Sequence, residues 1–273
     1  PAKLWMTYEH IIRKASGLGV APKEQDTDHY EKTNEHCDVL VVGAGPSGIV
    51  AALHAARADA RVLLVDEQSE MGGRLLSQNV QIEGNASSEW LRSALLELQA
   101  FENVTLLGRT TAFGYHDGNF VTAVQRLTDH LPESKQRGAR EKVFRIRAKQ
   151  VILATGAHER PIPFGYNDRA GVMLASAVSS YVVRYSAPLA KRAVVFTNND
   201  GAYQTAIDLH RAGITVSAVV DSRSETNGDL PEIVRGLGIE VLTQSTVVKS
   251  KGGKSVTGAY VQSLSDDSKS LVG

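Results

Sequence analysis

The stretch CDVLVVGAGPSG, which runs from Cys37 to Gly48, decides the fold that this sequence predicts. Its first part, residues 37–42, is an apolar run of strand length that is rich in β-branched valine. Residues 49–58, directly after it, are rich in alanine and other good helix formers. A strand, a glycine-spaced turn and a helix in immediate succession predict the first unit of a dinucleotide-binding fold.

The three glycines of the turn each have a physical role in such a unit. Gly43 permits the tight turn, Gly45 lets the backbone approach a pyrophosphate, and Gly48 lets the helix pack closely on the strand. The N-terminus of the helix carries free N–H groups and the positive end of the helix dipole, so it is expected to face the phosphates. A glycine turn that packs a helix without holding a ligand is the alternative, and the residues that follow argue against it.

An acidic pair follows the second predicted strand. Residues 61–65, RVLLV, are predicted to form that strand, and Asp66 and Glu67 lie 18 and 19 residues after Gly48. This is the place where an acid accepts hydrogen bonds from the two hydroxyls of the adenosine ribose. An acid here favours NAD or FAD over NADP, because it repels the 2′-phosphate of NADP.

Three further stretches are expected to contact the cofactor. Gly72 and Gly73 let the chain wrap closely, and Arg74 is expected to meet a phosphate, with a solvated arginine in a turn as the alternative. A buried strand at 151–156, VILATG, closes the sheet beneath the cofactor, and the turn 108–111 lies where such folds contact the adenine. The candidate cofactor-binding residues are Gly43, Gly45, Pro46, Ser47, Gly48, Asp66, Glu67, Gln68, Gly73, Arg74, Leu75, Thr111, Ala154, Thr155 and Gly156.

Periodicity predicts the remaining elements of the first domain. They are a crossover helix at 90–101 capped by Ser87 or Ser88, a strand at 104–107, and a β-meander at about 113–148. The strands of the meander, 115–125 and 143–148, flank a polar loop at 128–140. The meander is expected to be inserted before the closing strand of the unit.

A second strand-turn-helix unit is predicted from Arg192 onward. It consists of a strand at 192–197, a helix at 202–212, a strand at 214–221, a helix at 230–238 and closing strands at 240–243, 246–251 and 255–262. When this unit is aligned on the first, Gly43, Gly45 and Gly48 fall on Thr197, Asn199 and Ala202. Because Asn199 and Asp200 would crowd or repel a pyrophosphate, we expect the Asn198–Asp200 turn to have lost ordinary nucleotide binding.

The predicted fold is therefore α/β, with three segments along the chain. Residues 1–36 are predicted to form a polar N-terminal arm with a short helix at 8–15 that stops at Gly17-Leu18-Gly19. Residues 37–163 are the dinucleotide-binding domain, and residues 164–273 are a second, degenerate domain of the NAD(P) type. We expect the chain to be a fragment, with the second domain truncated and a sheet edge of the first left open.

Composition narrows the range of functions. Lys and Arg balance Asp and Glu at 30 each, so no net charge points to nucleic acid. No apolar run reaches the roughly 18 residues that cross a bilayer, so no membrane contact is expected. The single cysteine, Cys37, is compatible with a reducing cytoplasm and excludes a two-cysteine redox centre within this chain.

No residue of this chain is assigned to catalysis or to a metal. No grouping of His, Cys, Asp and Glu has a spacing typical of metal ligands. His158 lies in the segment that leads out of the first domain, with no matching base or nucleophile in view. We therefore favour a cofactor or interface contact for His158 over acid–base catalysis.

Several longer stretches of this sequence resemble the alpha subunit of heterotetrameric sarcosine oxidase. That family has the two-dinucleotide-binding flavoprotein scaffold that glutathione reductase also has. The resemblance runs through nearly all of the chain, and the TNND turn at 197–200 is more specific than the glycine pattern. The stretches that carry it are YEHIIRKASGLG (8–19), HCDVLVVG (36–43), VDEQ (65–68), ATGAHERP (154–161), NDRAGVM (167–173) and TNNDGAY (197–203).

The resemblance implies a Rossmann-like fold, an NAD in the first site, and a cytoplasmic complex with beta, gamma and delta subunits. It also implies an FMN at a subunit interface and an FAD on the beta subunit. The full enzyme of that family demethylates sarcosine to glycine, forms hydrogen peroxide and passes the one-carbon unit to tetrahydrofolate. It carries a small domain before this region and a folate-handling domain after it.

Three alternatives remain at the sequence level. The first is the alpha subunit of an opine, hydroxyproline or other amine dehydrogenase, which would hold FAD in the first site. The second is a standalone NAD(P)H-dependent flavin reductase, which the degenerate second turn and the missing cysteine pair argue against. The third is a structural subunit with no cofactor, which the acid and the glycines of the first site argue against.

Overall fold

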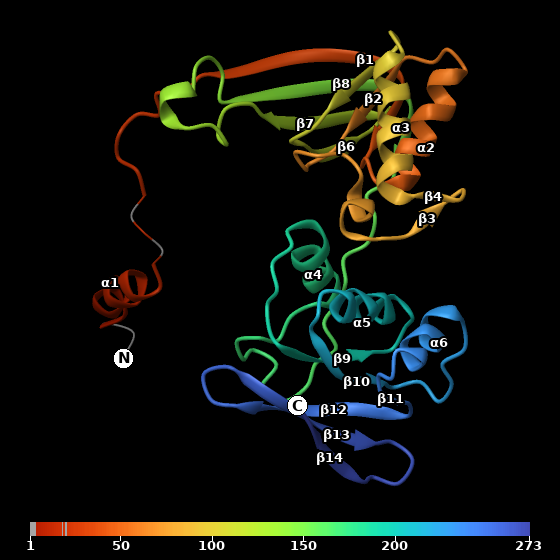
Figure 1. The fold of residues 1–273 in the computed structure, drawn as a ribbon. Helices are drawn as coiled ribbons and strands as arrows, with labels where there is room; N and C mark the ends of the chain where they lie inside the picture. Colours follow the sequence, from red (N-terminus) through yellow and green to blue (C-terminus); the bar gives the residue numbers. More distant parts are fainter. Residues whose placement is uncertain (1–3, 18, 20) are drawn as a thin grey trace.

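The computed structural model describes residues 4–17, 19 and 21–273 of the chain. Its first helix, α1 (Trp5–Ala15), lies apart from the sheets in Figure 1 and buries none of its residues. The helix predicted at 8–15 is thus confirmed, although it begins at Trp5. Leu18, in the predicted stop Gly17-Leu18-Gly19, lies outside the described residues.

Six strands form the main sheet, in the order β5-β2-β1-β8-β7-β6 (Figure 1). The first four strands in this order run parallel, and β7 and β6 continue the sheet antiparallel. The strands predicted at 61–65 and 104–107 are confirmed as β2 and β5. The bounds are β1 (Tyr30–Val42), β2 (Val62–Val65), β5 (Val104–Leu107), β6 (Thr110–His116), β7 (Phe120–Arg126) and β8 (Glu141–Leu153).

Strands β1 and β8 are longer than the sequence predicts. Residues 30–36, which the sequence analysis places in the arm, pair in register with residues 141–147 of β8. Most of their side chains are exposed or half-buried on both faces of the sheet, so the apolar alternation that marks a strand is missing. The predicted meander strand 143–148 and the predicted closing strand are also one continuous strand, β8, and not two. The buried strand predicted at 151–156 is wrong in part, because β8 ends at Leu153 and both Ile152 and Leu153 are exposed.

The strand predicted at 115–125 is instead a hairpin. Strand β6 ends at His116, and β7 begins at Phe120. Gly118 and Asn119 between them both have positive φ, +65° and +52°. Two consecutive residues of this kind are typical of the tight turn that joins two antiparallel strands. The turn is short enough to be hidden inside an alternating sequence.

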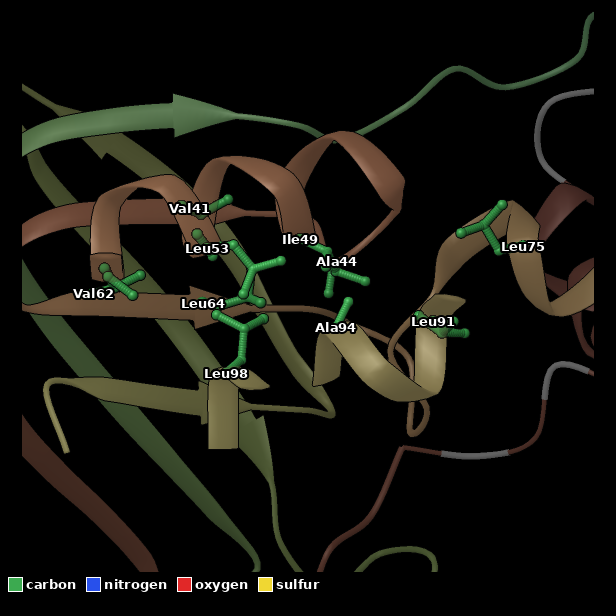
Figure 2. Close-up of a cluster of buried hydrophobic side chains, with 12 residues drawn as sticks. Val41, Ala44, Ile49, Leu53, Val62, Leu64, Leu75, Leu91, Ala94 and Leu98 are labelled. Carbon is green, nitrogen blue, oxygen red and sulfur yellow. The ribbon is translucent and has the colours of Figure 1, made fainter. Parts of the chain in front are cut away.

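Helices α2 (Pro46–Arg57) and α3 (Ser87–Ala100) pack on the parallel strands. Figure 2 shows the core that they form, in which Leu64 of β2 lies between Leu53 of α2 and Leu98 of α3. Ile49, Leu64 and Leu98 are fully buried. This core fixes the glycine turn at the end of β1, because the turn leads directly into α2.

Short elements connect these helices and strands. The N-cap of α3 is Ala86, so the predicted cap by Ser87 or Ser88 is wrong. The buried Ser87 hydroxyl instead donates to the carbonyl of Gln78, which ties the helix start to the preceding loop. The short elements are the 3-10 helices η2 (Gly73–Ser77) and η3 (Glu133–Lys135) and the paired strands β3 (Gln81–Ile82) and β4 (Asn85–Ala86).

The second half repeats the strand-turn-helix arrangement. Its parallel sheet has the order β11-β10-β9, and a separate antiparallel sheet has the order β12-β13-β14. The predicted strands and helices are confirmed within a few residues, and β14 is an addition that the sequence analysis missed. The elements are α4 (Ala175–Ser179), the π-helix η4 (Ser180–Arg184), β9 (Arg192–Thr197), α5 (Gly201–Arg211), β10 (Thr215–Asp221), α6 (Asp229–Gly236), β11 (Val241–Leu242), β12 (Ser245–Gly252), β13 (Val256–Ser263) and β14 (Lys269–Val272).

The two parallel units have the same strand pairing except for one extra residue in the second. In the first, Val39 pairs with Val62 and Val42 with Val65; in the second, Ala193 pairs with Val216 and Phe196 with Val220. At the strand ends, the paired residues are therefore one residue further apart along the chain in the second unit than in the first. A β-bulge between Val216 and Ala218 accommodates that extra residue.

This register sets which residues of the turns correspond. Thr197 pairs with Asp221 in the second unit, and the matching positions of the first unit are Gly43 and Asp66. The register therefore supports the alignment of Gly43, Gly45 and Gly48 with Thr197, Asn199 and Ala202.

Candidate functional site

A cleft of about 2560 Å³ runs between the two halves of the chain. The predicted cofactor-binding residues that line it are Gly43, Gly45, Pro46, Ser47, Asp66, Glu67, Gln68, Gly73, Arg74, Thr111, Ala154, Thr155 and Gly156. Two predicted residues do not line it. Gly48 is buried between helix and strand, and the side chain of Leu75 belongs to the core shown in Figure 2.

The turn between β1 and α2 is a cradle that only glycine allows. A Cβ on Gly48 would lie 1.8 Å from the carbonyl oxygen of Gly43, so any side chain at this position of α2 would collide with the turn. Gly43 has a φ of +101°, and its Cβ would lie 2.3 Å from the carbonyl oxygen of Ala154. These two glycines are thus required by packing.

Gly45 differs from the other two glycines. A Cβ built on it would meet nothing within 4 Å, and its φ of −74° is one that any residue adopts. Neither packing nor conformation within this chain therefore requires a glycine at this position. Open space in front of the backbone is what the approach of a pyrophosphate needs.

The segment after the acidic pair lies against the same turn. The N–H of Gly72 donates to the carbonyl of Ala44 over 2.8 Å, and a Cβ on Gly73 would lie 2.9 Å from the Cα of Gly45. Arg74 follows directly, is exposed and lines the cleft. The predicted wrapping segment is therefore adjacent to the glycine turn, with a guanidinium at the edge of the cleft.

The closing strand reaches the turn from the other side. The N–H of Ala154 donates to the carbonyl of Val42 over 2.8 Å, which continues the β1–β8 pairing to the edge of the cleft. Thr155 and Gly156 continue from it and are exposed there. Thr111 lines the cleft at the start of β6, next to the buried Thr110, whose hydroxyl donates to the carbonyl of Gly108.

These features fit a dinucleotide. The N–H groups of Ser47 and Gly48 lie in the first turn of α2, where a helix offers them no acceptor. The space in front of Gly45 is open, and Arg74 supplies a positive charge. The residues present thus match a pyrophosphate held at the helix N-terminus.

Asp66 has a second role that the sequence analysis did not foresee. Its Oδ2 accepts a hydrogen bond of 2.6 Å from the N–H of Ala44, and its Oδ1 accepts one of 2.8 Å from the N–H of Gln68. Glu67 is exposed and lines the cleft. Arg126, from β7, donates to the main-chain carbonyl of Glu67 over 3.0 Å.

The corresponding turn of the second unit is filled by its own side chains. The N–H of Asn199 donates to the hydroxyl of Thr197, and the N–H of Gly201 donates to the side-chain oxygen of Asn199. Asp200 forms an ion pair with Arg223 over 2.8 Å. Main-chain donors that a phosphate would need are already bonded here.

The segment between the halves carries His158 and Glu159, both exposed and lining the cleft. The Glu159 carboxylate accepts hydrogen bonds from the N–H groups of Ala175 and Ser176 at the start of α4. A second link between the halves is the ion pair of Glu70 with Arg184 over 2.7 Å. Neither Glu159, which lies within the ATGAHERP stretch, nor Arg184 is a candidate site residue by sequence, because no motif there predicts these contacts.

Two kinds of feature are absent from the described part of the chain. It holds no cluster of three or more His, Cys, Asp or Glu side chains placed to bind a metal ion. No helix among the same residues has the length and apolar character to span a bilayer.

Comparison with known proteins gives a family and several relatives. The family model described as pyridine nucleotide-disulphide oxidoreductase matches residues 37–271. The alpha subunit of sarcosine oxidase from Rhizobium meliloti strain 1021 is 45% identical over 262 residues, which are 96% of this chain and 26% of that protein. An opine oxidase subunit of Agrobacterium tumefaciens strain Ach5 is 27% identical over 190 residues, 68% of this chain and 37% of that protein.

A solved structure shares the fold. The crystal structure of L-proline dehydrogenase from P. horikoshii matches with a TM-score of 0.63 at 22% identity, over 92% of this chain and 43% of that one. The comparisons thereby confirm the predicted α/β, Rossmann-like fold and the resemblance to the alpha subunit of sarcosine oxidase. This chain spans about a quarter of the length of the alpha subunit that it matches.

Proposed function

The chain belongs to the pyridine nucleotide-disulphide oxidoreductase family, and from this premise we propose that it is the NAD-binding region of the alpha subunit of a sarcosine oxidase. The observation that carries the proposal is the contrast within the glycine turn. Gly43 and Gly48 are required by packing, whereas Gly45 faces open space beside a helix N-terminus. A bound dinucleotide of this kind accepts or donates a hydride, and the residues of this chain bind and orient it.

The proposed role of the residues follows their positions. The first turn of α2, with Ser47 and Gly48, would hold the pyrophosphate together with Arg74. The acidic pair favours an unphosphorylated ribose, which is the basis for choosing NAD over NADP. We assign no residue of this chain to catalysis. The Ser179 hydroxyl at the cleft does donate to the Asp208 carboxylate over 3.3 Å, but both residues are buried.

The larger complex is part of the same proposal. It comprises beta, gamma and delta subunits, an FMN at a subunit interface and an FAD on the beta subunit, in the cytoplasm. Together they would oxidise the N-methyl group of sarcosine, leaving glycine. The electrons would reduce oxygen to hydrogen peroxide, and the one-carbon unit would pass to tetrahydrofolate. This assignment is supported by the identity of 45% to the alpha subunit of a sarcosine oxidase.

The test is to denature the purified protein and identify the released cofactor by absorbance and mass spectrometry. Released NAD is the expected result. If the protein releases nothing, it is next titrated with NAD and with FAD. A protein that binds neither of the two would overturn the proposal. A matched control is the same protein carrying Gly45→Ala, which we expect to fold and to release nothing.

A second candidate is the alpha subunit of an opine, hydroxyproline or other amine dehydrogenase, with FAD in the first site. The observation that favours it is the 27% identity to an opine oxidase subunit over 68% of this chain. Released FAD in the same experiment would select this candidate and give the chain a direct redox role. The adenosine and pyrophosphate are common to NAD and FAD, so the glycine turn serves either one.

A further inference from the structure

The two neighbouring acids at the end of β2 have different tasks. Taking the dinucleotide site of the proposed function as given, we propose that Glu67, and not Asp66, binds the ribose hydroxyls of the adenosine. Asp66 is a positioning residue that fastens the glycine turn to the end of β2. The assignment rests on the contacts of Asp66, on its counterpart in the second unit and on the placement of Glu67.

The Asp66 carboxylate is committed to the main chain. Both of its oxygens accept short hydrogen bonds from backbone N–H groups, 2.6 Å from Ala44 and 2.8 Å from Gln68. Ala44 lies within the glycine turn, and Gln68 lies in the loop that follows the strand. An aspartate has one methylene group between Cα and the carboxylate, so these two bonds hold the Asp66 carboxylate close to its own backbone, although the residue lines the cleft. Its effect is to lock the turn and the loop together.

The second unit provides an internal comparison. Asp221 occupies the position that corresponds to Asp66, as the strand register shows. Its Oδ1 accepts a hydrogen bond of 2.9 Å from the N–H of Arg223, two residues on, just as Asp66 does from Gln68. Asp221 is fully buried and also accepts from the hydroxyl of Tyr203.

This contact persists where the turn is closed to phosphate. The donors of the second turn are bonded to Thr197 and Asn199, yet the aspartate and its backbone bond are still present. The aspartate and its bond from the residue two positions on therefore belong to the architecture of both units. An acid that recognises a ligand is expected only in the unit whose turn is open.

Glu67 meets that expectation. Its counterpart in the second unit is the uncharged Ser222, so the second acid occurs only beside the open turn. Glu67 is exposed at the cleft, and Arg126 holds its main chain in place. Its side chain is one methylene longer than that of Asp66, and its Oε1 lies 3.5 Å from the side-chain amide of Gln68. Two carboxylate oxygens on a longer, exposed side chain suit two vicinal hydroxyls.

The experiment compares Glu67→Gln and Asp66→Asn, with Glu102→Gln as the control. Glu102 is an exposed glutamate outside the cleft. For the full chain and each variant, calorimetry measures the dissociation constants for NAD, NADP and FAD, and a thermal melt without ligand measures Tm. Binding constants and Tm separate a ligand contact from a positioning contact without any measurement of turnover.

Glu67→Gln is expected to weaken NAD and FAD binding about tenfold or more, since it removes a charged acceptor of hydrogen bonds. NADP binding should weaken less, so the preference for NAD over NADP narrows while Tm stays unchanged. Asp66→Asn is expected to lower Tm, because an amide cannot accept from two N–H groups through both of its terminal atoms. It should weaken NAD and NADP binding by the same factor. Glu102→Gln should change nothing.

The opposite pattern overturns the assignment. If Asp66→Asn narrows the NAD preference with Tm unchanged, or if Glu67→Gln leaves the preference as it was, Asp66 is the ribose ligand. Should Asp66→Asn fail to fold, the Glu67→Gln result decides alone. If the wild-type protein binds neither NAD nor FAD, the proposed function itself is contradicted. That outcome is distinct from one in which the wild-type protein binds a dinucleotide and Glu67→Gln binds it equally well.

Discussion

At the scale of single residues, the second unit contains two buried carboxylates in contrasting surroundings. Burial alone would raise the pKa of Asp221, but hydrogen bonds from the Arg223 guanidinium and backbone lower it below the ordinary value. Burial raises the pKa of Tyr203, which donates to Asp221, to about 12. For Asp208, on α5, burial outweighs the hydrogen bonds from Gln204 and Ser179, and its pKa is raised. One carboxylate thus stabilises the fold when it is charged, and the other when it is neutral.

Asp208→Asn is expected to remove a loss of folding stability that grows as the pH rises. Because the folded pKa of Asp208 lies above its unfolded value, the folded chain binds more protons between the two values, and stability falls as pH rises through that window. An asparagine can accept from Gln204 and donate to the Ser179 hydroxyl, so the local bonds are kept. Relative to wild type, the unfolding free energy of the variant should therefore rise as the pH increases from the unfolded pKa of an aspartate, 3.8, through the raised pKa of the folded state.

The measurement is denaturant unfolding at a series of pH values, with Asp168→Asn, an exposed aspartate, as the control. The control should follow the wild-type curve. A variant that loses stability at neutral pH would show that the charge on Asp208 supports the fold.

At the scale of elements, the strand-turn-helix of residues 37–57 could be predicted because local rules determine it. Glycine spacing, an apolar strand and a good helix-forming sequence all agree there, and the structure bears out each element. The N-terminal half of β1 could not be predicted, since residues 30–36 acquire strand structure by pairing with residues 141–147 and not from their own pattern. The β6–β7 hairpin was missed because its turn is short and both flanks alternate.

The glycine turn offers a matched pair of substitutions. Gly48→Ala should lower the unfolding free energy by about 1–3 kcal/mol or more, since its Cβ would lie 1.8 Å from the carbonyl oxygen of Gly43 and the backbone must move. Gly45→Ala should leave stability nearly unchanged, because nothing lies within 4 Å of that Cβ. It should nevertheless weaken dinucleotide binding at least tenfold by filling the space that the pyrophosphate needs.

Urea unfolding and calorimetric titration of both variants check this pair. Equal loss of stability in the two variants would contradict the assignment of Gly48 to packing. Unchanged affinity in Gly45→Ala would place the pyrophosphate elsewhere.

At the scale of the whole molecule, the cleft could not be predicted from the sequence, because it depends on how the two halves meet. His158 was singled out there, yet its neighbour Glu159 makes the contacts to α4 that the structure shows. The ion pair between Glu70 and Arg184 joins segments 114 residues apart, and no local pattern marks it. Arg184 also lies over the ring of Tyr185, 5.3 Å from its centroid, in the wide turn of a π-helix.

Arg184→Ala is expected to loosen this link without unfolding either half. Glu70 is 65% exposed, so the unfolding free energy should change by less than about 1 kcal/mol. The segment 157–163 between the halves should become more sensitive to a protease of broad specificity. The double variant Arg184→Glu with Glu70→Arg should restore resistance.

Arg57→Ala is the control for this experiment, because it breaks a comparable exposed ion pair, with Glu97, inside the first half. It should leave cleavage of the linking segment unchanged. Equal cleavage in the Arg184 and Arg57 variants would assign no linking role to the Glu70–Arg184 pair.

The bulge at Ser217 has a consequence for how the two units can be exchanged. Since the extra residue is absorbed within β10, the six positions that lead from the strand end into the helix correspond one to one in the two units, although α2 has 12 residues and α5 has 11. Residues 197–202 therefore form a cassette of the same size as residues 43–48. A protein engineer could transplant GAGPSG into the second unit without adjusting any loop. The transplant would also replace Asp200 and so remove its ion pair with Arg223, which would keep its ion pair with Asp221. The second unit thus has the strand-turn-helix frame of a dinucleotide site, and a working site there would need both the glycine turn and an acid in place of Ser222.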